Sequence, residues 1–170
     1  MSDSKEQILE ILQKAFQIEV DGHTFYSMAR DQARNPAVEE LFDKLASDEV
    51  EHKRYLAQVA TDYDAKGVAA FRIDRRSPDL KALSASIFTD QFKQQAKGAA
   101  FEMGVLSIGM TLENNAISYF NRAAKLASDQ EVKDFYEFLA NWEKEHLEAL
   151  QGLYNGVRQD FWQESGFSPF

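Results

Sequence analysis

One pattern of glutamate and histidine occurs twice in this 170-residue chain, and the second copy lies 94 residues after the first. Each copy consists of a lone glutamate followed, thirty residues later, by Glu-x-x-His. The residues are Glu19, Glu49 and His52 in the first copy and Glu113, Glu143 and His146 in the second. A pattern repeated at a constant offset indicates two copies of one structural unit, which limits the folds open to the chain.

Each of these residues interrupts a stripe of apolar or small side chains spaced three and four positions apart. The stripes run over residues 12–33 and 38–59, and matching stripes cover residues 106–127 and 132–153. This spacing is typical of the buried face of an α-helix. The sequence therefore predicts four amphipathic helices that carry the ionisable side chains on their buried faces.

Turn signals join these helices in pairs. Asn35-Pro36 ends the first helix and starts the second, because Asn caps helices well and Pro suits the first helical position. Ser128 and Glu131 have the spacing of a capping box that opens the fourth helix. Turns this short make the two helices of each pair antiparallel.

The resulting hairpins span about residues 4–63 and 98–157. The connection between them, residues 64–97, is too long for a tight turn, and we read it as a crossover with a short helix inside it. Residues 158–170 form an aromatic-rich C-terminal extension, which we expect to pack on the bundle or on a neighbouring subunit. The predicted fold is all-α: one domain over residues 1–170, an antiparallel four-helix bundle with a long crossover between helices 2 and 3.

Composition excludes several classes of function. The net charge of −9 argues against nucleic-acid and anionic-membrane partners. The absence of cysteine excludes disulfides, zinc ribbons, thiol catalysis and Cys-ligated iron–sulfur centres. The N-terminal residues lack a signal-peptide core, and no apolar run approaches the roughly 18 residues of a membrane span. We expect a cytoplasmic protein with no membrane partner.

Helical geometry lets the repeated residues act as metal ligands. Residues three positions apart lie about 60° apart around a helix and about 4.5 Å apart along it. The pair Glu49 and His52 can therefore bind one ion and the second pair another, while the lone glutamates approach from facing helices. Four carboxylates carry four negative charges, which two divalent ions neutralise. Two single Glu plus two Glu-x-x-His is the ligand set of dinuclear sites in four-helix bundles.

Mixed oxygen and nitrogen ligands suit iron or manganese, whereas calcium and magnesium prefer oxygen alone. Two iron ions are our first choice, because dinuclear carboxylate sites of this type use the iron redox couple; manganese and zinc are the alternatives. A metal-free structural bundle is disfavoured. Four unpaired carboxylates in a core would be strongly destabilising, and no Lys or Arg occupies these stripes to pair with them.

Four further polar residues lie near the predicted ligands. Tyr26 is two turns beyond Glu19 on the same face, so its hydroxyl can reach a ligand carboxylate and support catalysis; the alternative is a core aromatic. His23 either lines the entrance to the site or is an ordinary surface histidine. Asp48 either orients an imidazole or is a solvated acid, and Glu102 either serves metal entry or is a surface charge.

The segments Ile18-Glu-Val-Asp-Gly-His-Thr-Phe-Tyr26 and Leu112-Glu-Asn-Asn-Ala-Ile-Ser-Tyr-Phe120 resemble the paired glutamate-containing helices of the rubrerythrin family, within the ferritin-like superfamily. With the two Glu-x-x-His helices, the resemblance covers most of residues 5–155. Tyr26 matches the family's ligand-bonding tyrosine. The resemblance implies a ferritin-like four-helix bundle with a non-haem diiron centre, and chemistry with peroxide or dioxygen.

The sequence departs from the family in two places. Full rubrerythrins carry a rubredoxin domain with a Cys-ligated iron, whereas this chain has no cysteine and so no built-in electron relay of that kind. Rubrerythrins also have a seventh carboxylate three residues after the third-helix glutamate, where this sequence has Ala116. The six-ligand set is nearer to the bacterioferritin pattern.

The resemblance favours a rubrerythrin-like diiron oxidoreductase that acts on hydrogen peroxide or dioxygen in oxidative-stress defence. An external electron-donor protein would re-reduce it. A ferritin-type ferroxidase that stores or detoxifies iron is the first alternative, and a non-enzymatic metal-stabilised interaction or sensor module is the second. The long crossover and the aromatic tail look more like rubrerythrin-type chains, which commonly dimerise, so a homodimer is expected.

Overall fold

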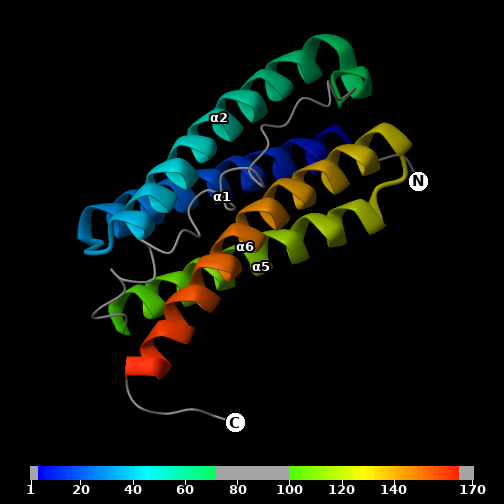
Figure 1. Ribbon diagram of the computed structural model, residues 1–170. Helices are drawn as coiled ribbons and strands as arrows, with labels where there is room; N and C mark the ends of the chain where they lie inside the picture. The colour runs from blue at the N-terminus through cyan, green and yellow to red at the C-terminus, as the bar shows by residue number, and fades with distance from the viewer. Residues whose placement is uncertain (1–3, 72–99, 165–170) are drawn as a thin grey trace.

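Four long helices form two antiparallel hairpins in the computed structural model, which describes residues 4–71 and 100–164 (Figure 1). The elements are α1 (Lys5–Gln32), α2 (Pro36–Lys66), the 3-10 helix η1 (Gly67–Phe71), α5 (Ala100–Leu126) and α6 (Gln130–Glu164). Helix α1 packs along α2, and α5 packs along α6; the two hairpins meet through α1 with α5 and through α2 with α6. The predicted four-helix bundle is confirmed.

Polar caps start the helices. Ser4 and Gln7 form a capping box on α1, in which the Gln7 amide donates to the Ser4 hydroxyl at 3.2 Å. Asn35 Oδ1 accepts from the Ala37 amide at 2.9 Å and caps α2, as the sequence predicts. The capping box predicted at Ser128 is wrong by one residue. Asp129 caps α6 instead, because its Oδ1 accepts from the amide of Glu131 at 2.8 Å.

The helices extend further than the sequence predicts. Helix α2 continues to Lys66, and η1 follows it, ending at the buried Phe71. The first residues of the predicted crossover are therefore helical, and its remaining part, residues 72–99, lies outside the described residues. Helix α6 runs to Glu164, so the start of the predicted C-terminal extension is helical; residues 165–170 also lie outside the described residues. No helix of the described ranges is long and apolar enough to cross a membrane.

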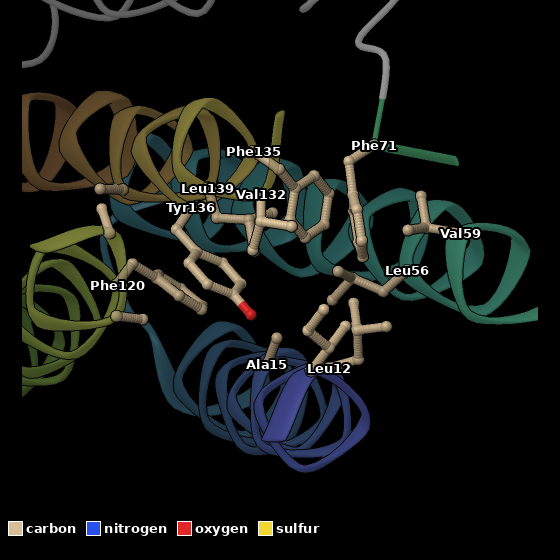
Figure 2. Packing of buried hydrophobic residues seen from close by; sticks show 14 of the residues in the cluster. Leu12, Ala15, Leu56, Val59, Phe71, Phe120, Val132, Phe135, Tyr136 and Leu139 are labelled. Atoms are coloured by element: carbon tan, nitrogen blue, oxygen red, sulfur yellow. The ribbon is translucent and has the colours of Figure 1, made fainter. Parts of the chain in front are cut away.

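Two apolar clusters fill the bundle, one toward each end. The first packs Leu12, Leu56, Phe120 and Phe135 around one another, and Figure 2 shows Phe71 closing it beside Phe135. The second is built from other turns of the same four helices, and its largest side chains are Tyr26, Phe42, Leu45, Leu106 and Leu150. On every helix, the predicted ligands lie between the residues of the two clusters. Packed apolar layers therefore enclose the polar layer from both sides and limit water there.

Candidate metal centre

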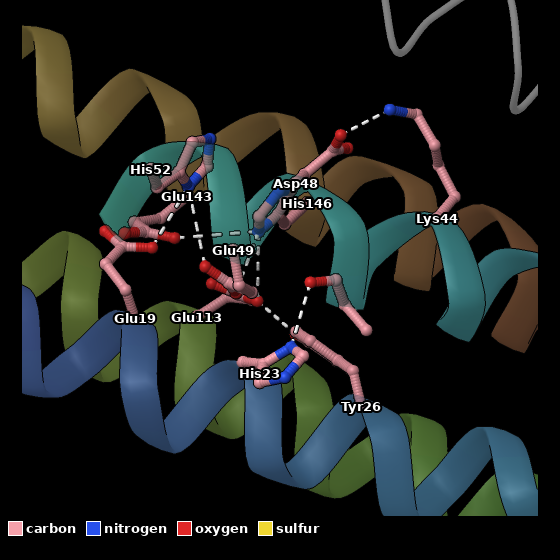
Figure 3. A network of polar contacts seen from close by, with 11 residues as sticks. Glu19, His23, Tyr26, Lys44, Asp48, Glu49, His52, Glu113, Glu143 and His146 are labelled. Carbon is pink, nitrogen blue, oxygen red and sulfur yellow. Dashed lines mark hydrogen bonds and ion pairs between the residues drawn. The ribbon is translucent and has the colours of Figure 1, made fainter. Parts of the chain in front are cut away.

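All six predicted ligands are buried in this central layer (Figure 3). Their exposed fractions run from 0% for Glu19 and His146 to 6% for His52. Burial of four carboxylates is costly unless each is paired or bound to a metal ion. Within the described part of the chain, no Lys or Arg ion pair reaches any of them.

The ligand atoms form two groups that share one residue. Glu49, Glu113, Glu143 and His146 make the first group, in which one atom of each lies within 4.8 Å of the others. Glu19, Glu49 and His52 make the second. We expected Glu49 to bind one ion together with His52. Its carboxylate belongs to both groups, so Glu49 would be able to offer an oxygen to an ion in either one.

Both imidazoles point Nδ1 at the carboxylates. His52 Nδ1 lies 3.0 Å from Glu19 Oε2 and 3.5 Å from Glu49 Oε2. His146 Nδ1 lies 3.5 Å from Glu49 Oε1, 3.5 Å from Glu113 Oε1 and 3.7 Å from Glu143 Oε2. Nitrogen and oxygen ligands bind a divalent ion at about 2.0–2.2 Å, so ligand atoms around one ion are separated by about 3 Å. The observed separations are close to that spacing.

Several of these atoms lack hydrogen-bond partners, which supports the fit to metal ions. His146 is 0% exposed, yet neither of its ring nitrogens has a hydrogen bond. The carboxylate atoms Glu19 Oε1, Glu49 Oε2 and Glu143 Oε1 are likewise buried without a partner. Buried polar atoms are nearly always satisfied in folded proteins. Two divalent cations would satisfy this set, so the residues present fit a dinuclear centre.

Burial and mutual repulsion change the acidity of the cluster. Burial, together with the neighbouring Glu49, raises the pKa of Glu19 to about 8, and His52 opposes this only in part. Burial and the charges of Glu19 and Glu113 raise the pKa of Glu143 well above its usual value. Without metal, burial and mutual repulsion therefore favour the protonated forms of these two carboxyl groups, and metal binding releases such protons.

His146 and Glu113 shift in opposite directions because they face each other. Burial alone would lower the pKa of His146, but the charges of Glu49 and Glu113 outweigh it and raise that pKa well above the usual value. Burial alone would raise the pKa of Glu113, but His146 and the Tyr26 hydroxyl outweigh it and lower that pKa. The neighbouring carboxylates thus favour the protonated form of the His146 imidazole in the metal-free site.

Tyr26 makes the contact that its position on the helix predicts. It is fully buried, and its hydroxyl donates a hydrogen bond to Glu113 Oε1. Burial and the charges of Glu113 and Glu49 raise its pKa well above the ordinary value, so it remains a donor at neutral pH. The bond holds one carboxylate oxygen and thereby orients the other.

Gly22 leaves the space that Glu49 occupies. A Cβ atom at this position would lie 2.6 Å from Glu49 Oε1, closer than real Cβ contacts, and 3.0 Å from its Cδ. The absence of a side chain on this turn of α1 therefore lets the shared carboxylate reach both groups. The sequence showed Gly22 as a small residue on the buried stripe, but not which side chain it accommodates.

Trp142, which precedes Glu143 on α6, also contacts a proposed ligand, and the sequence did not indicate this contact. Its indole stacks on the His52 imidazole, with ring centroids 4.0 Å apart and an angle of 2° between the planes. Tyr55 packs edge-on against Trp142 at 5.2 Å. Nothing in the sequence distinguishes this tryptophan from other core aromatic residues, because the contact joins two helices.

The remaining polar neighbours differ from their simplest predicted roles. Asp48 is not a solvated acid: it is 4% exposed and forms an ion pair with Lys44. Glu102 is not a surface charge either, since it is 4% exposed and its Oε1 accepts from the Arg34 amide at 3.4 Å. His23 is half-buried, and its Nδ1 donates to the Ala46 carbonyl at 3.0 Å. It therefore ties α1 to α2.

Comparison with known proteins agrees with this arrangement. Searches among curated proteins and among solved structures gave no significant match. The model of one protein family, rubrerythrin, matches residues 10–154, a segment that contains both ligand groups and Tyr26. The match covers most of the chain. The four-helix bundle and the buried Glu/His clusters of the structure are consistent with a diiron site. The chain belongs to the rubrerythrin family.

Proposed function

We propose that this protein is a diiron oxidoreductase that reduces hydrogen peroxide, with Glu19, Glu49, His52, Glu113, Glu143 and His146 as the metal ligands. The observation that carries the proposal is the pair of buried ligand groups sharing Glu49, inside a chain of the rubrerythrin family. The unbonded ring nitrogens of His146 support it further.

Two iron ions held there would supply two electrons and polarise the O–O bond of the oxidant. Glu49 would balance charge between the two positions, because it lies within reach of both groups. The Tyr26 hydroxyl would keep the Glu113 carboxylate oriented. The apolar layers on either side would exclude bulk water, which strengthens electrostatic interactions inside the site.

Iron suits this donor set better than calcium or magnesium, because both groups mix carboxylate oxygen with imidazole nitrogen. Manganese and zinc fit the same ligands, so metal analysis of protein from iron-replete cells belongs to the test. The electron donor is proposed to be a separate protein, since none of the 170 residues is a cysteine that could hold an additional, electron-relaying iron. We also propose a homodimer as the working assembly.

A ferritin-type ferroxidase is the second candidate, and Ala116 is the observation that favours it. This residue occupies the position at which rubrerythrins have a seventh carboxylate, and the six-ligand set that remains is nearer to the bacterioferritin pattern. A ferroxidase that stores iron needs a hollow cage, which elutes from a gel-filtration column far earlier than a dimer.

Stopped-flow oxidation of the anaerobic ferrous protein separates the two functions. The peroxidase proposal expects hydrogen peroxide to oxidise the protein faster than dioxygen does, with two ferrous ions consumed per peroxide. Faster oxidation by dioxygen, accompanied by a growing ferric core and cage-sized particles, would contradict it in favour of iron storage. Zinc-loaded protein provides the redox-inert control.

A further inference from the structure

A cleft of about 250 Å³ lies between α1 and α5 and leads to the metal ligands. Its inner end is formed by Glu49, Glu113 and Glu143. Glu143 is 1% exposed, and its Oε1 has no hydrogen-bond partner. The cleft therefore gives a small molecule a way from solvent to the layer of proposed metal ligands.

Most of the wall surface of the cleft is apolar, and Lys14, Asp21 and Asn115 add polar groups to it. Ile18 comes from α1, and Leu112, Ala116 and Tyr119 come from α5. Ala116 is 4% exposed, whereas Leu112 is 36% exposed and lies nearer the solvent. The combination of mainly apolar walls with a small number of polar groups is the usual form of a site for a small organic molecule.

Two small residues keep the inner end accessible. Gly22 and Ala116 both line the cleft, and they occupy matched positions of the repeat, 94 residues apart. A side chain on Gly22 would collide with Glu49, because its Cβ would lie 2.6 Å from Glu49 Oε1. A larger side chain on Ala116 would project into the same cleft from α5. The depth of the cleft therefore depends on both residues being small.

The size of the cleft exceeds what hydrogen peroxide needs. A water molecule occupies about 30 Å³ of liquid volume, and hydrogen peroxide only about twice that. The cleft offers several times this space, and apolar walls add nothing to the binding of so polar a molecule. Alkyl or aryl groups would gain from these walls, by about fourfold in affinity for each buried methylene.

We propose that this cleft binds the organic group of an alkyl or aryl hydroperoxide and directs its O–O end to the carboxylates. The proposal names a substrate class for the centre and rests on the proposed function. Reduction breaks the O–O bond of ROOH and yields ROH and water. The reaction takes two electrons, one from each ferrous ion as it becomes ferric, and two protons from solvent.

Binding is tested without turnover by using 2-phenyl-2-propanol, the redox-inert alcohol that corresponds to cumene hydroperoxide. It is titrated into metal-free and zinc-loaded protein while backbone amide NMR signals are followed. We expect saturable shifts at Ile18, Leu112 and Tyr119. Leu112→Ala should weaken binding about fourfold or more, because it removes an apolar wall. Ile108→Ala, an exposed residue of the same helix outside the cleft, should leave binding unchanged.

Stopped-flow oxidation then compares cumene hydroperoxide with hydrogen peroxide on the ferrous protein. Ala116→Leu should slow oxidation of the protein by cumene hydroperoxide at least tenfold and oxidation by hydrogen peroxide less than threefold. Leu112→Ala, at a partly exposed site, serves if Ala116→Leu fails to fold. Absence of saturable shifts, or equal weakening by Leu112→Ala and Ile108→Ala, would overturn the cleft proposal. Oxidation by hydrogen peroxide tests the proposed function separately, so the two can fail independently.

Discussion

The Trp142 indole lies parallel to the His52 imidazole at a centroid distance of 4.0 Å, so an aromatic ring covers one proposed ligand directly. Of the two tryptophans in the chain, the other, Trp162, is exposed and lies beside Arg158. A paramagnetic ion bound to His52 would quench the emission of a ring in van der Waals contact with that ligand. Trp142 should therefore report metal binding.

The corresponding measurement uses two single-tryptophan variants. In Trp162→Phe, which retains Trp142, fluorescence should fall as manganese(II) or cobalt(II) is added. In Trp142→Phe, which retains Trp162, it should not. Equal responses in the two variants would mean that metal does not bind beside His52.

Gly22→Ala should weaken metal binding without unfolding the protein. Alanine is favoured over glycine within a helix by about 1 kcal/mol. The new Cβ would, however, lie 2.6 Å from Glu49 Oε1 and would displace the Glu49 carboxylate. We expect affinity for manganese(II), measured by calorimetric titration, to drop about tenfold or more. Gly104→Ala is the matched control on α5, where a Cβ meets nothing within 4 Å. Its affinity should match the wild type, and a loss shared by both variants would contradict this account.

Tyr26→Phe should destabilise the metal-free protein more than the metal-loaded protein. The variant removes the hydrogen bond to Glu113 and leaves a buried carboxylate oxygen without its donor, which costs about 1.5–3 kcal/mol. When metal binds Glu113, coordination compensates part of that loss. Urea unfolding of both forms measures the difference, with Tyr154→Phe, on a half-buried tyrosine remote from the ligands, as control. An equal loss of stability with and without metal would mean that the Tyr26 hydrogen bond does not act on a metal ligand.

Metal should stabilise the protein more strongly as pH rises from 5 to 8. The pKa of Glu19 is raised to about 8 in the folded, metal-free state, and that of Glu143 is also raised. Above pH 4.5 the folded, metal-free protein therefore keeps protons on these two groups that the unfolded chain has released. The contribution of the two groups to the free energy of unfolding therefore falls as the pH rises. The raised pKa of His146 acts in the same direction.

Metal replaces these protons, and its binding strengthens as proton competition declines. A hundredfold excess over the dissociation constant contributes about 2.7 kcal/mol. Calorimetric melts of metal-free and metal-loaded protein should show a Tm gap that widens from pH 5 to pH 8. A constant gap, or none, would show that the carboxylates do not form one shared buried site.

Helical periodicity was sufficient to predict the bundle and the buried layer of six side chains. Each glutamate and histidine interrupts an apolar stripe, and burial of that stripe buries them too. The contact between Tyr26 and Glu113 could also be predicted from the sequence, because it depends on the spacing along one helix and on a facing helix at the usual distance. Asn35-Pro36 similarly marks a helix boundary through local chemistry alone.

Features that depend on how two helices meet were not accessible in this way. The position of Glu49 between both groups depends on its rotamer and on the space above Gly22. The Trp142–His52 stack depends on the rotation of α6 against α2. Periodicity gives the direction of a side chain around its own helix, but not its neighbour on the next one.

Iron stoichiometry tests the central claim, a single dinuclear site made by the six residues, most directly. Metal-free protein is loaded anaerobically with excess iron(II), freed of unbound metal by gel filtration and subjected to elemental analysis. Wild type should hold two iron ions per chain, while Glu19→Ala and Glu113→Ala should each hold fewer than two and remain helical. Glu51→Ala, an exposed acid inside the first Glu-x-x-His, should still hold two. Two iron ions per chain in Glu19→Ala and Glu113→Ala, or fewer than two in wild type, would contradict the account.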